Sequence, residues 1–232
     1  MKKNKGFSLI EMAIALIILG FILGGLIIPL RSQRDQQQIY RTVSSLEEVK
    51  DALLGFAVIH GRLPCSDKNG DGKENNKEVM TMIYDLINIC ESNNEGYLPW
   101  KDLGVGRYDA WGNPFRYRVG KEYTEIILSN KFFFDKDKIF VTGSDLRIRN
   151  REGDYFTTKP SSDSRVAAII FSLGKNKVAD DDNAVLDEIF VYDGYVENEK
   201  EPEKAFDDVL TWLSRNTLMN HLITGRNEET WP

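Results

Sequence analysis

The chain has 232 residues, a formal net charge of −6 and two cysteines. This length is enough for one membrane helix and one domain with a real core. Outside its extreme N-terminus the sequence has no block of basic residues. Because nucleic-acid binding needs a basic face, we expect no nucleic-acid partner.

The N-terminal segment begins with three lysines and continues as a long apolar run. Gly6 follows the lysines, and residues 7–30 contain Glu11 as their only charged residue. A membrane span needs roughly 20 mostly apolar residues, so the run is long enough to cross a bilayer. A secretory signal has a shorter apolar core, with its small-residue cleavage site after that core. Here the small residue comes first, so cleavage at Gly6 would leave the span attached to the mature protein.

A family resemblance is carried by residues 5–11, which read Lys-Gly-Phe-Ser-Leu-Ile-Glu. This stretch resembles the N-terminal signature of type IV pilins and of the pseudopilins of type II secretion. The resemblance implies that a prepilin peptidase cleaves the chain between Gly6 and Phe7 and methylates the new amine of Phe7. It also implies that Glu11 meets the free N-terminal amine of a neighbouring subunit during filament assembly.

The charge of Glu11 fits this assembly role. A lone carboxylate in hydrocarbon costs on the order of 2.5–3.5 kcal/mol, and such residues usually mark function. Pairing the carboxylate with an amine would remove that cost. In the alternative interpretation, Glu11 lies near enough to the cytoplasmic headgroups to remain hydrated.

The charges that flank the apolar run predict its orientation. Lysines precede the run, whereas Arg31, Arg34 and Asp35 follow it, which favours a cytoplasmic N-terminus. We expect a single-pass inner-membrane protein whose head is periplasmic or displayed on a cell-surface filament. Disulfides persist in that environment. The resemblance adds an inner-membrane assembly platform as a partner.

Apolar residues recur at steps of three and four after the run, as in an amphipathic helix, at Ile39, Val43, Leu46, Val49, Leu53 and Phe56. We expect one long helix from about Ser8 to about Ile59, stopped by Gly61 and Pro64. The predicted organisation is a leader peptide at 1–6, a transmembrane helix half at 7–30, an amphipathic helix half at 31–60 and an extracytoplasmic head at 61–232.

Cys65 and Cys90 are the only cysteines of the chain. Two cysteines in an extracytoplasmic domain most simply form a disulfide. A disulfide that closes the loop between residues 65 and 90 would contribute roughly 3 kcal/mol to stability in the loop-entropy description. Two free thiols are the alternative.

Residues 67–78 fit the calcium-loop pattern D-x-[DN]-x-[DN]-G-x5-E in full. Calcium takes about six to eight hard oxygen ligands. The predicted ligands are the side chains of Asp67, Asn69, Asp71 and Glu78 and the carbonyl of Lys73. The alternative is a polar turn built by Asx residues and glycines, because 63–65 does not resemble an entering helix and Glu74 stands where such loops usually carry an aliphatic residue.

The rest of the head is read mainly as strands. We expect a short helix at 79–89 and a tight turn at 111–114 that leads into an alternating strand at 115–119. The sequence of residues 109–114, Asp-Ala-Trp-Gly-Asn-Pro, is similar to the turn of major pseudopilins. Further strands are expected at 123–128, 131–134, 139–142, 166–173 and 207–213. Ser214 is expected to cap a final helix that stops at Gly225.

A second calcium candidate follows the strand at 166–173. The Ser-Leu-Gly strand end at 172–174 and the acidic stretch after it resemble the calcium loop of major pseudopilins, although the glycines that follow in that family are missing here. The resemblance implies a ligand set drawn from Asp180, Asp181, Asp182 and Asp187.

These elements predict an α+β fold in which a long N-terminal helix packs on a mainly antiparallel sheet, as in pilins. The sequence shows no nucleophile–base pair and no phosphate loop, so we expect no catalysis and no organic cofactor. We expect a structural subunit of a type IV pilus or type II secretion filament, processed by prepilin peptidase and assembled with other pilin or pseudopilin subunits. The large head favours a minor subunit, since the surface of a major one must tile. The alternative is a membrane-anchored extracytoplasmic module that binds calcium or another ligand.

Overall fold

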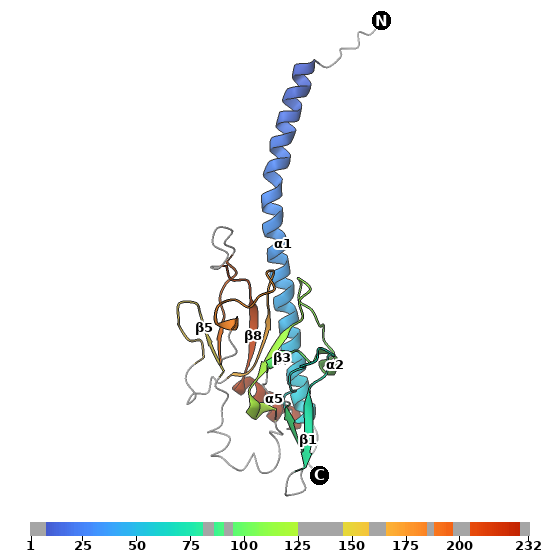
Figure 1. Cartoon of the computed structure of the whole chain (residues 1–232), viewed down its shortest axis with the longest axis vertical. Coiled ribbons are helices and arrows are strands. Elements are labelled where there is room, and N and C mark those ends of the chain that lie inside the picture. Colours follow the sequence, from blue (N-terminus) through green and yellow to red (C-terminus); the bar gives the residue numbers. More distant parts are fainter. Residues whose placement is uncertain are drawn as a thin grey trace. The chain divides into compact units, whose positions relative to one another are not determined.

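The computed structural model describes residues 8–80, 86–90, 95–124, 146–157, 166–184, 188–196 and 205–227 (Figure 1). Within these ranges the side chains of residues 21–32, 78–80, 86–89, 182, 184, 226 and 227 lie outside the description. The chain divides into two compact units, Met1–Tyr40 and Arg41–Pro232. Helix α1, which spans Leu9–His60, begins in the first unit and ends in the second.

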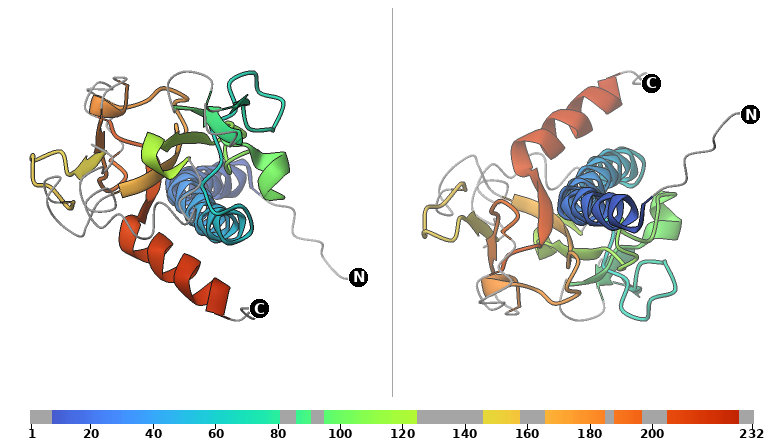
Figure 2. Two further views of the ribbon diagram at one scale, coloured as in Figure 1. Left: turned by 90° about the horizontal axis from the view of Figure 1, so that it is seen from below. Right: turned by 90° about the horizontal axis from the view of Figure 1, so that it is seen from above.

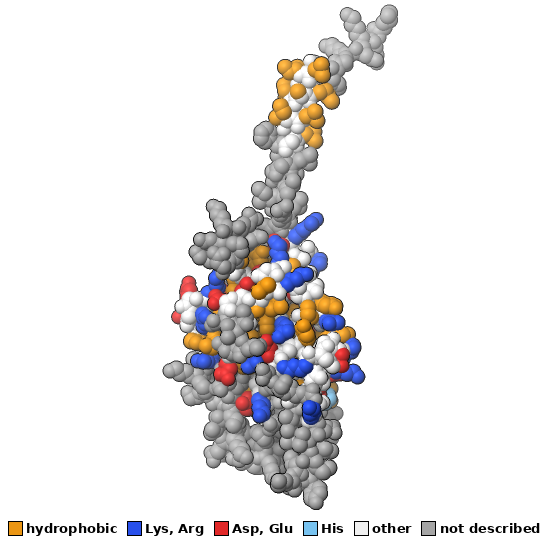
Figure 3. All heavy atoms as spheres, in the orientation of Figure 1, with side chains coloured by type: hydrophobic (Ala, Val, Ile, Leu, Met, Phe, Trp, Pro, Cys, Tyr) orange, Lys and Arg blue, Asp and Glu red, His pale blue; other side chains and the backbone are white. Residues whose placement is uncertain are grey.

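The first unit holds the N-terminal part of α1. Its apolar side chains between residues 9 and 19 are exposed, and Figure 3 shows them gathered along this stretch of the helix. Among the described residues, no helix is long and apolar enough to pass through a membrane. Much of the predicted span is not covered by this statement, because residue 7 and the side chains of residues 21–30 are not described.

The core of the second unit forms between the C-terminal half of α1 and a four-stranded antiparallel sheet (Figure 2). The sheet has the order β3-β4-β6-β8, with β3 at Glu95–Tyr97, β4 at Arg116–Val119, β6 at Val166–Ser172 and β8 at Val209–Ser214. Leu46, Val49 and Leu53 of α1 lie in one buried cluster with Tyr117 and Ile170 of the sheet. The predicted α+β fold, with its N-terminal helix on a mainly antiparallel sheet, is confirmed.

Strand β6 is buried along its whole length because both of its faces are covered. Ala168 and Ile170 lie in the cluster with α1, whereas Ile169 and Phe171 lie in a second cluster with Phe190. Successive side chains of a strand point to opposite faces, so the two clusters sit on opposite sides of the sheet. The second cluster also takes residues from β5 (Arg147–Arg149) and β7 (Ile189–Val191), which form a short parallel pair. A continuous apolar sequence is typical of a strand with no solvent face.

The predicted helix at 79–89 is wrong. Strand β1 (Asn76–Met80) pairs antiparallel with β2 (Leu86–Cys90), and Asn76 stands opposite Cys90 in the register. The apolar residues of this segment recur at mixed spacing, which does not decide between helix and strand, and several of them are β-branched, which favours a strand. The Cys65–Cys90 disulfide fixes one end of this hairpin to the loop that follows α1.

The final helix, α5, spans Arg215–Asn227. The Ser214 hydroxyl accepts a hydrogen bond from the Thr217 backbone N–H at 3.1 Å, which confirms the predicted N-cap. The predicted stop at Gly225 is wrong, because α5 continues to Asn227. A Cβ atom at Gly225 would lie 2.8 Å from Cγ1 of Val58, so this glycine allows α5 to approach α1 closely.

The remaining predicted boundaries have mixed outcomes. Helix α1 ends at His60, and Gly61 follows with φ of +70°, as the predicted stop requires. The strand expected at 123–128 begins instead with the 3₁₀ helix η1 (Lys121–Tyr123). The rest of that strand, and those expected at 131–134 and 139–142, lie outside the described residues. The structure also has a short helix α2 (Trp100–Leu103) and a 3₁₀ helix η2 (Asp181–Ala184).

Candidate functional site

The start of α1 carries a capping arrangement that includes Glu11. The Ser8 backbone N–H donates to Oε2 of Glu11 at 3.0 Å, and the Ile10 backbone N–H points to the Ser8 hydroxyl at 3.4 Å. This is the reciprocal geometry of a capping box, in which a serine and a glutamate three residues later satisfy free backbone donors of the first turn. The Ser-x-x-Glu spacing could have revealed it from sequence. Gly6 and Phe7, the predicted processing residues, lie outside the described part of the chain.

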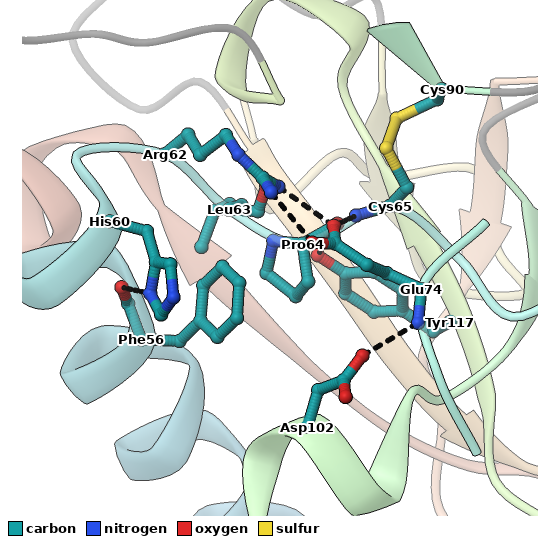
Figure 4. Close-up of polar contacts among 10 residues, drawn as sticks. All are labelled: Phe56, His60, Arg62, Leu63, Pro64, Cys65, Glu74, Cys90, Asp102 and Tyr117. Carbon is teal, nitrogen blue, oxygen red and sulfur yellow. Dashed lines mark hydrogen bonds and ion pairs between the residues drawn. A yellow bond between two sulfur atoms is a disulfide. The ribbon is translucent and has the colours of Figure 1, made fainter. Parts of the chain in front are cut away.

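The loop after α1 is held by a buried ion pair, shown in Figure 4. Both terminal nitrogens of Arg62 donate to the Glu74 carboxylate, at 2.7 and 2.6 Å. The Cys65 backbone N–H donates to Oε2 of Glu74 at 2.9 Å, and the Glu74 N–H donates to Asp102 at 2.7 Å. Glu74 therefore stands where a calcium loop usually has an aliphatic residue because it organises the loop itself.

The predicted disulfide lies beside this ion pair. Cys65 and Cys90 are bonded, with their Cα atoms 5.4 Å apart. The prediction of a disulfide is confirmed, and the alternative of two free thiols is wrong. The Tyr117 hydroxyl, which is buried in the sheet, donates to the Pro64 carbonyl at 3.1 Å and fixes the residue before Cys65 (Figure 4).

The carboxylate of Asp67, the first predicted calcium ligand, is buried and accepts three backbone hydrogen bonds from its own loop. Oδ1 accepts from the N–H groups of Asn69 and Gly70, at 3.1 and 2.7 Å. Oδ2 accepts from the N–H of Gly72 at 2.8 Å. Such bonds are typical of an Asx-and-glycine turn, which was the alternative interpretation of this loop.

Two of the other predicted ligands of this loop, Asn69 and Asp71, are hydrogen-bonded within the loop. Asn69 Nδ2 donates to Asp71 Oδ2 at 3.1 Å, and Asp71 Oδ1 accepts from the Lys73 N–H at 2.8 Å, both at the exposed edge of the loop. Glu78 lies in β1, and its side chain is outside the description. The calcium assignment at 67–78 remains a prediction.

A second acidic group is assembled from two segments far apart in the sequence. Asp180 precedes η2, whereas Asp207 and Asp208 precede β8, and one carboxylate oxygen from each lies within 4.8 Å of the others. We call these three residues the acidic cluster. Asp207 is 7% exposed and Asp208 is 5% exposed.

Hydrogen bonds between the two segments hold the acidic cluster in place. Asp180 Oδ2 accepts from the Asp207 N–H at 2.7 Å, and Asp208 Oδ2 accepts from the Asp180 N–H at 2.8 Å. Asp207 Oδ2 accepts from the Asn176 N–H at 2.8 Å, and Asn183 Nδ2 donates to Asp208 Oδ2 at 3.0 Å. Each buried aspartate thus uses Oδ2 to tie the segments together.

The other carboxylate oxygen of each buried aspartate does not take part in these hydrogen bonds. Oδ1 of Asp207 and Oδ1 of Asp208 are buried and have no hydrogen-bond partner in the described structure. Burial raises the pKa of Asp207 from 3.8 to about 6 and that of Asp208 to about 7, and the nearby Asp180 carboxylate adds to both shifts. A buried carboxylate without compensation is costly, so the acidic cluster favours a bound cation or proton.

A buried polar network connects the acidic cluster to the turn at 109–114. Asn113 Nδ2 donates to the Gly174 carbonyl at 2.6 Å and to Asp109 Oδ2 at 3.1 Å, and the Ser172 hydroxyl donates to Asp109 Oδ2 at 2.5 Å. Gly174 has φ of +60°, and a Cβ atom there would lie 2.2 Å from the Asp207 carbonyl oxygen. The glycine therefore allows the loop after β6 to contact the segment that carries Asp207.

The acidic cluster shares only Asp180 with the predicted second calcium site. Asp181 instead lies 3.4 Å from Nε of Arg151 as an exposed ion pair. The side chain of Asp182 and the whole of Asp187 are outside the described residues. Sequence reasoning placed Asp207 and Asp208 in the last strand and missed them as site residues. The available signal was a pair of adjacent carboxylates directly before an apolar strand.

Comparison with known proteins finds a family signature in the N-terminal segment. Residues 1–27 match the family model of the prokaryotic N-terminal methylation motif. This motif is the signature of type IV pilins and pseudopilins, so the chain carries that signature, and it indicates a pilin-like or pseudopilin subunit. Proteins with this motif are structural subunits rather than enzymes. Searches of curated proteins and of solved structures found no match to the chain.

Proposed function

We propose that the chain is a non-catalytic minor subunit of a type IV pilus or type II secretion filament. The observation that carries the proposal is the match of residues 1–27 to the N-terminal methylation motif. In this proposal a prepilin peptidase cleaves after Gly6 and methylates Phe7. Residues 7–30 anchor the chain in the inner membrane with the N-terminus cytoplasmic, and the head is extracytoplasmic. Its partners are other pilin or pseudopilin subunits and the assembly platform.

The capping arrangement at Ser8 and Glu11 supports an assembly role for the N-terminus. The bond to the Ser8 N–H holds the Glu11 carboxylate at the amino end of α1. The positive end of the helix dipole stabilises a negative charge there. An amine from a neighbouring subunit would meet a carboxylate that is already oriented, so little side-chain freedom would be lost on pairing.

The size of the head supports a minor subunit. The described part of the head combines a four-stranded sheet, a parallel strand pair, a disulfide-linked hairpin and a final helix. A subunit that forms the bulk of a filament must repeat the same surface along its length. An elaborate head suits a tip or an initiation complex better.

The first test is the mass of the N-terminal peptide from protein recovered from membranes. We expect a chain that begins at methylated Phe7. A chain that still begins at Met1 or Lys2 would contradict processing and point to a plain signal anchor.

The second test separates the charge of Glu11 from its capping bond. Glu11→Val should leave cleavage intact and abolish incorporation into filaments. Glu11→Gln keeps an oxygen acceptor for the Ser8 N–H but removes the charge, so it should fail like Glu11→Val if pairing with an amine is required. Full incorporation of both variants would contradict the assembly role. An unchanged phenotype would instead favour a membrane-anchored ligand-binding module, the alternative function, to which the acidic cluster also points.

A further inference from the structure

The outer face of β4, which points away from α1, carries two arginines. Tyr117 and Val119 of β4 pack in the buried cluster with α1. Successive side chains of a strand point to opposite faces, so Arg116 and Arg118 lie on the outer face. Figure 3 shows Lys and Arg side chains gathered over the part of the head that carries β3 and α2. This surface is therefore basic, although the net charge of the chain is −6.

Arg107 extends this pair of arginines into a row. A Cβ atom at Gly70 would lie 3.8 Å from Nη2 of Arg107 and 3.9 Å from ring atoms of Tyr97. The guanidinium of Arg116 lies 5.1 Å from the centre of the same Tyr97 ring. We call Arg107, Arg116 and Arg118 the arginine row. Its members come together only through the fold, because the sequence has no basic block in this region.

The arginine row carries more positive charge than its paired carboxylate neutralises. Glu95 accepts from Nη2 of Arg116 at 3.2 Å and from Nη1 of Arg118 at 3.4 Å. A guanidinium has five N–H donors, so these contacts use one donor of each arginine. Arg107 forms no ion pair among the described residues. Its guanidinium lies 5.0 Å from the ring centre of Tyr108, which is 52% exposed.

Lys68 adds a fourth cation to this surface. Its Nζ donates to the backbone carbonyl of Glu95. Burial lowers the pKa of Lys68 below its ordinary value of 10.5; the Glu95 carboxylate opposes this shift, and Arg118 and Arg116 add to it. The ammonium group is therefore repelled by the two arginines. A bound anion would reduce this repulsion.

We propose that the arginine row binds an extended acidic segment of another protein. Guanidinium groups match the geometry of carboxylates. Arginine and tyrosine are enriched at protein–protein interfaces, whereas lysine is depleted, so the composition of this surface favours a protein partner. Arg116 and Arg118 stand about 6.6 Å apart along their strand, and acidic residues at every second position of an extended peptide repeat that spacing. The inference does not depend on the filament role, because the row belongs to the head alone.

The test is a binding titration of the purified full-length protein in non-ionic detergent with a fluorescently labelled peptide of four Glu-Ser repeats. Fluorescence anisotropy should show saturable binding that weakens as salt is raised, because salt screens exposed charges. A neutral peptide of four Gln-Ser repeats should not bind. Absence of binding at protein concentrations up to about 0.3 mM, which detects dissociation constants below the millimolar range, would overturn the proposal.

Two variants of the arginine row and one control locate the binding surface. Arg107→Gln and Arg116→Gln should each weaken peptide binding roughly tenfold, as expected for the loss of one charge-assisted contact. Arg147→Gln is the matched control, because the Arg147 guanidinium also lies over a tyrosine ring, 5.6 Å from the centre of Tyr155, but belongs to β5. Unchanged binding in both row variants, or an equal loss in the control, would contradict the assignment. Should one row variant fail to fold, the other decides.

Competing anions separate an acidic protein segment from other partners. Micelles that contain phosphatidylglycerol and a single-stranded oligothymidine should each displace the labelled peptide less effectively than unlabelled peptide does. More effective displacement by either one would assign the surface to a lipid headgroup or to nucleic acid and would overturn the proposal. Self-association of the protein that Arg107→Gln abolishes, measured by analytical ultracentrifugation, would identify a second copy as the partner and overturn it too.

Discussion

Two regions of the head bury aspartates, and they do so in opposite ways. Asp67 is fully buried, and both of its oxygens accept backbone N–H groups of its own loop. Asp207 and Asp208 are almost as buried, yet each leaves one oxygen without a partner in the described structure. A carboxylate surrounded by amides contributes to the stability of the loop. A carboxylate with an unsatisfied oxygen lowers stability until a proton or a cation reaches it.

The largest effect is expected for Gly174→Ala, which disturbs the acidic cluster without changing a carboxylate. The added Cβ would lie 2.2 Å from the Asp207 carbonyl oxygen. We expect a loss of about 1–2 kcal/mol for the left-handed backbone and about 1–3 kcal/mol more for overpacking, measured by chemical denaturation of the full chain. Gly104→Ala is the matched control, because Gly104 has φ of +69° with nothing within 4 Å of the added atom. Equal losses for the two variants would show that the contact with Asp207 does not matter.

Replacing aspartate by asparagine should change the free energy of unfolding differently at Asp67 and at Asp208. Asp67→Asn should lower the free energy of unfolding by about 1–3 kcal/mol in metal-free buffer, because an NH2 group would face a backbone N–H. Asp208→Asn should leave it unchanged or raise it at pH 8, because a buried charge is removed while an acceptor remains for the Asp180 N–H. Denaturation of both variants with chelator present measures this difference. Similar losses for both would mean that the two regions do not differ as described.

A smaller change in the stability of the protein is expected when the pH is varied. The folded-state pKa of Asp207 is raised to about 6 and that of Asp208 to about 7, above the ordinary value of 3.8. Between these values the folded state binds more protons than the unfolded state, so the metal-free protein should lose stability as pH rises from about 4 to about 7. Denaturation midpoints across this window, with chelator present, should show the decline. The double variant Asp207→Asn/Asp208→Asn should flatten it, and an unaltered slope in that variant would assign the decline to other groups.

The sequence predicted most of the elements whose causes are local. The alternation of 115–119, the apolar run of 166–173 and the serine cap at 214 are each visible in a few consecutive residues, and each is found in the structure. The hairpin of β1 and β2 was missed, since its apolar spacing is ambiguous and its pairing depends on a partner strand. Gly225 was wrongly predicted to end the helix. A glycine stands there because a side chain would collide with Val58 of α1, and this contact is not visible in the local sequence.

The candidate site was less predictable than the fold. The calcium pattern at 67–78 matched a motif, but a motif does not show that backbone amides of the same loop already occupy the Asp67 oxygens. The acidic cluster has no motif, because its residues are joined only when the loop after β6 meets the segment before β8. The methylation motif lies wholly in the first 27 residues, and the sequence therefore identified it fully.

Helices α1 and α5 contribute residues to the same buried hydrophobic cluster. Leu218 and Leu222 pack in one core with Leu46 and Leu53, although they lie at opposite ends of the head sequence. Since synthesis runs from the N-terminus, the core stays open until Leu222 has left the ribosome. The core of the head is therefore complete only once α5 packs against α1. A premature stop before Arg215 would leave α1 with an uncovered apolar face, a substrate for quality-control proteases.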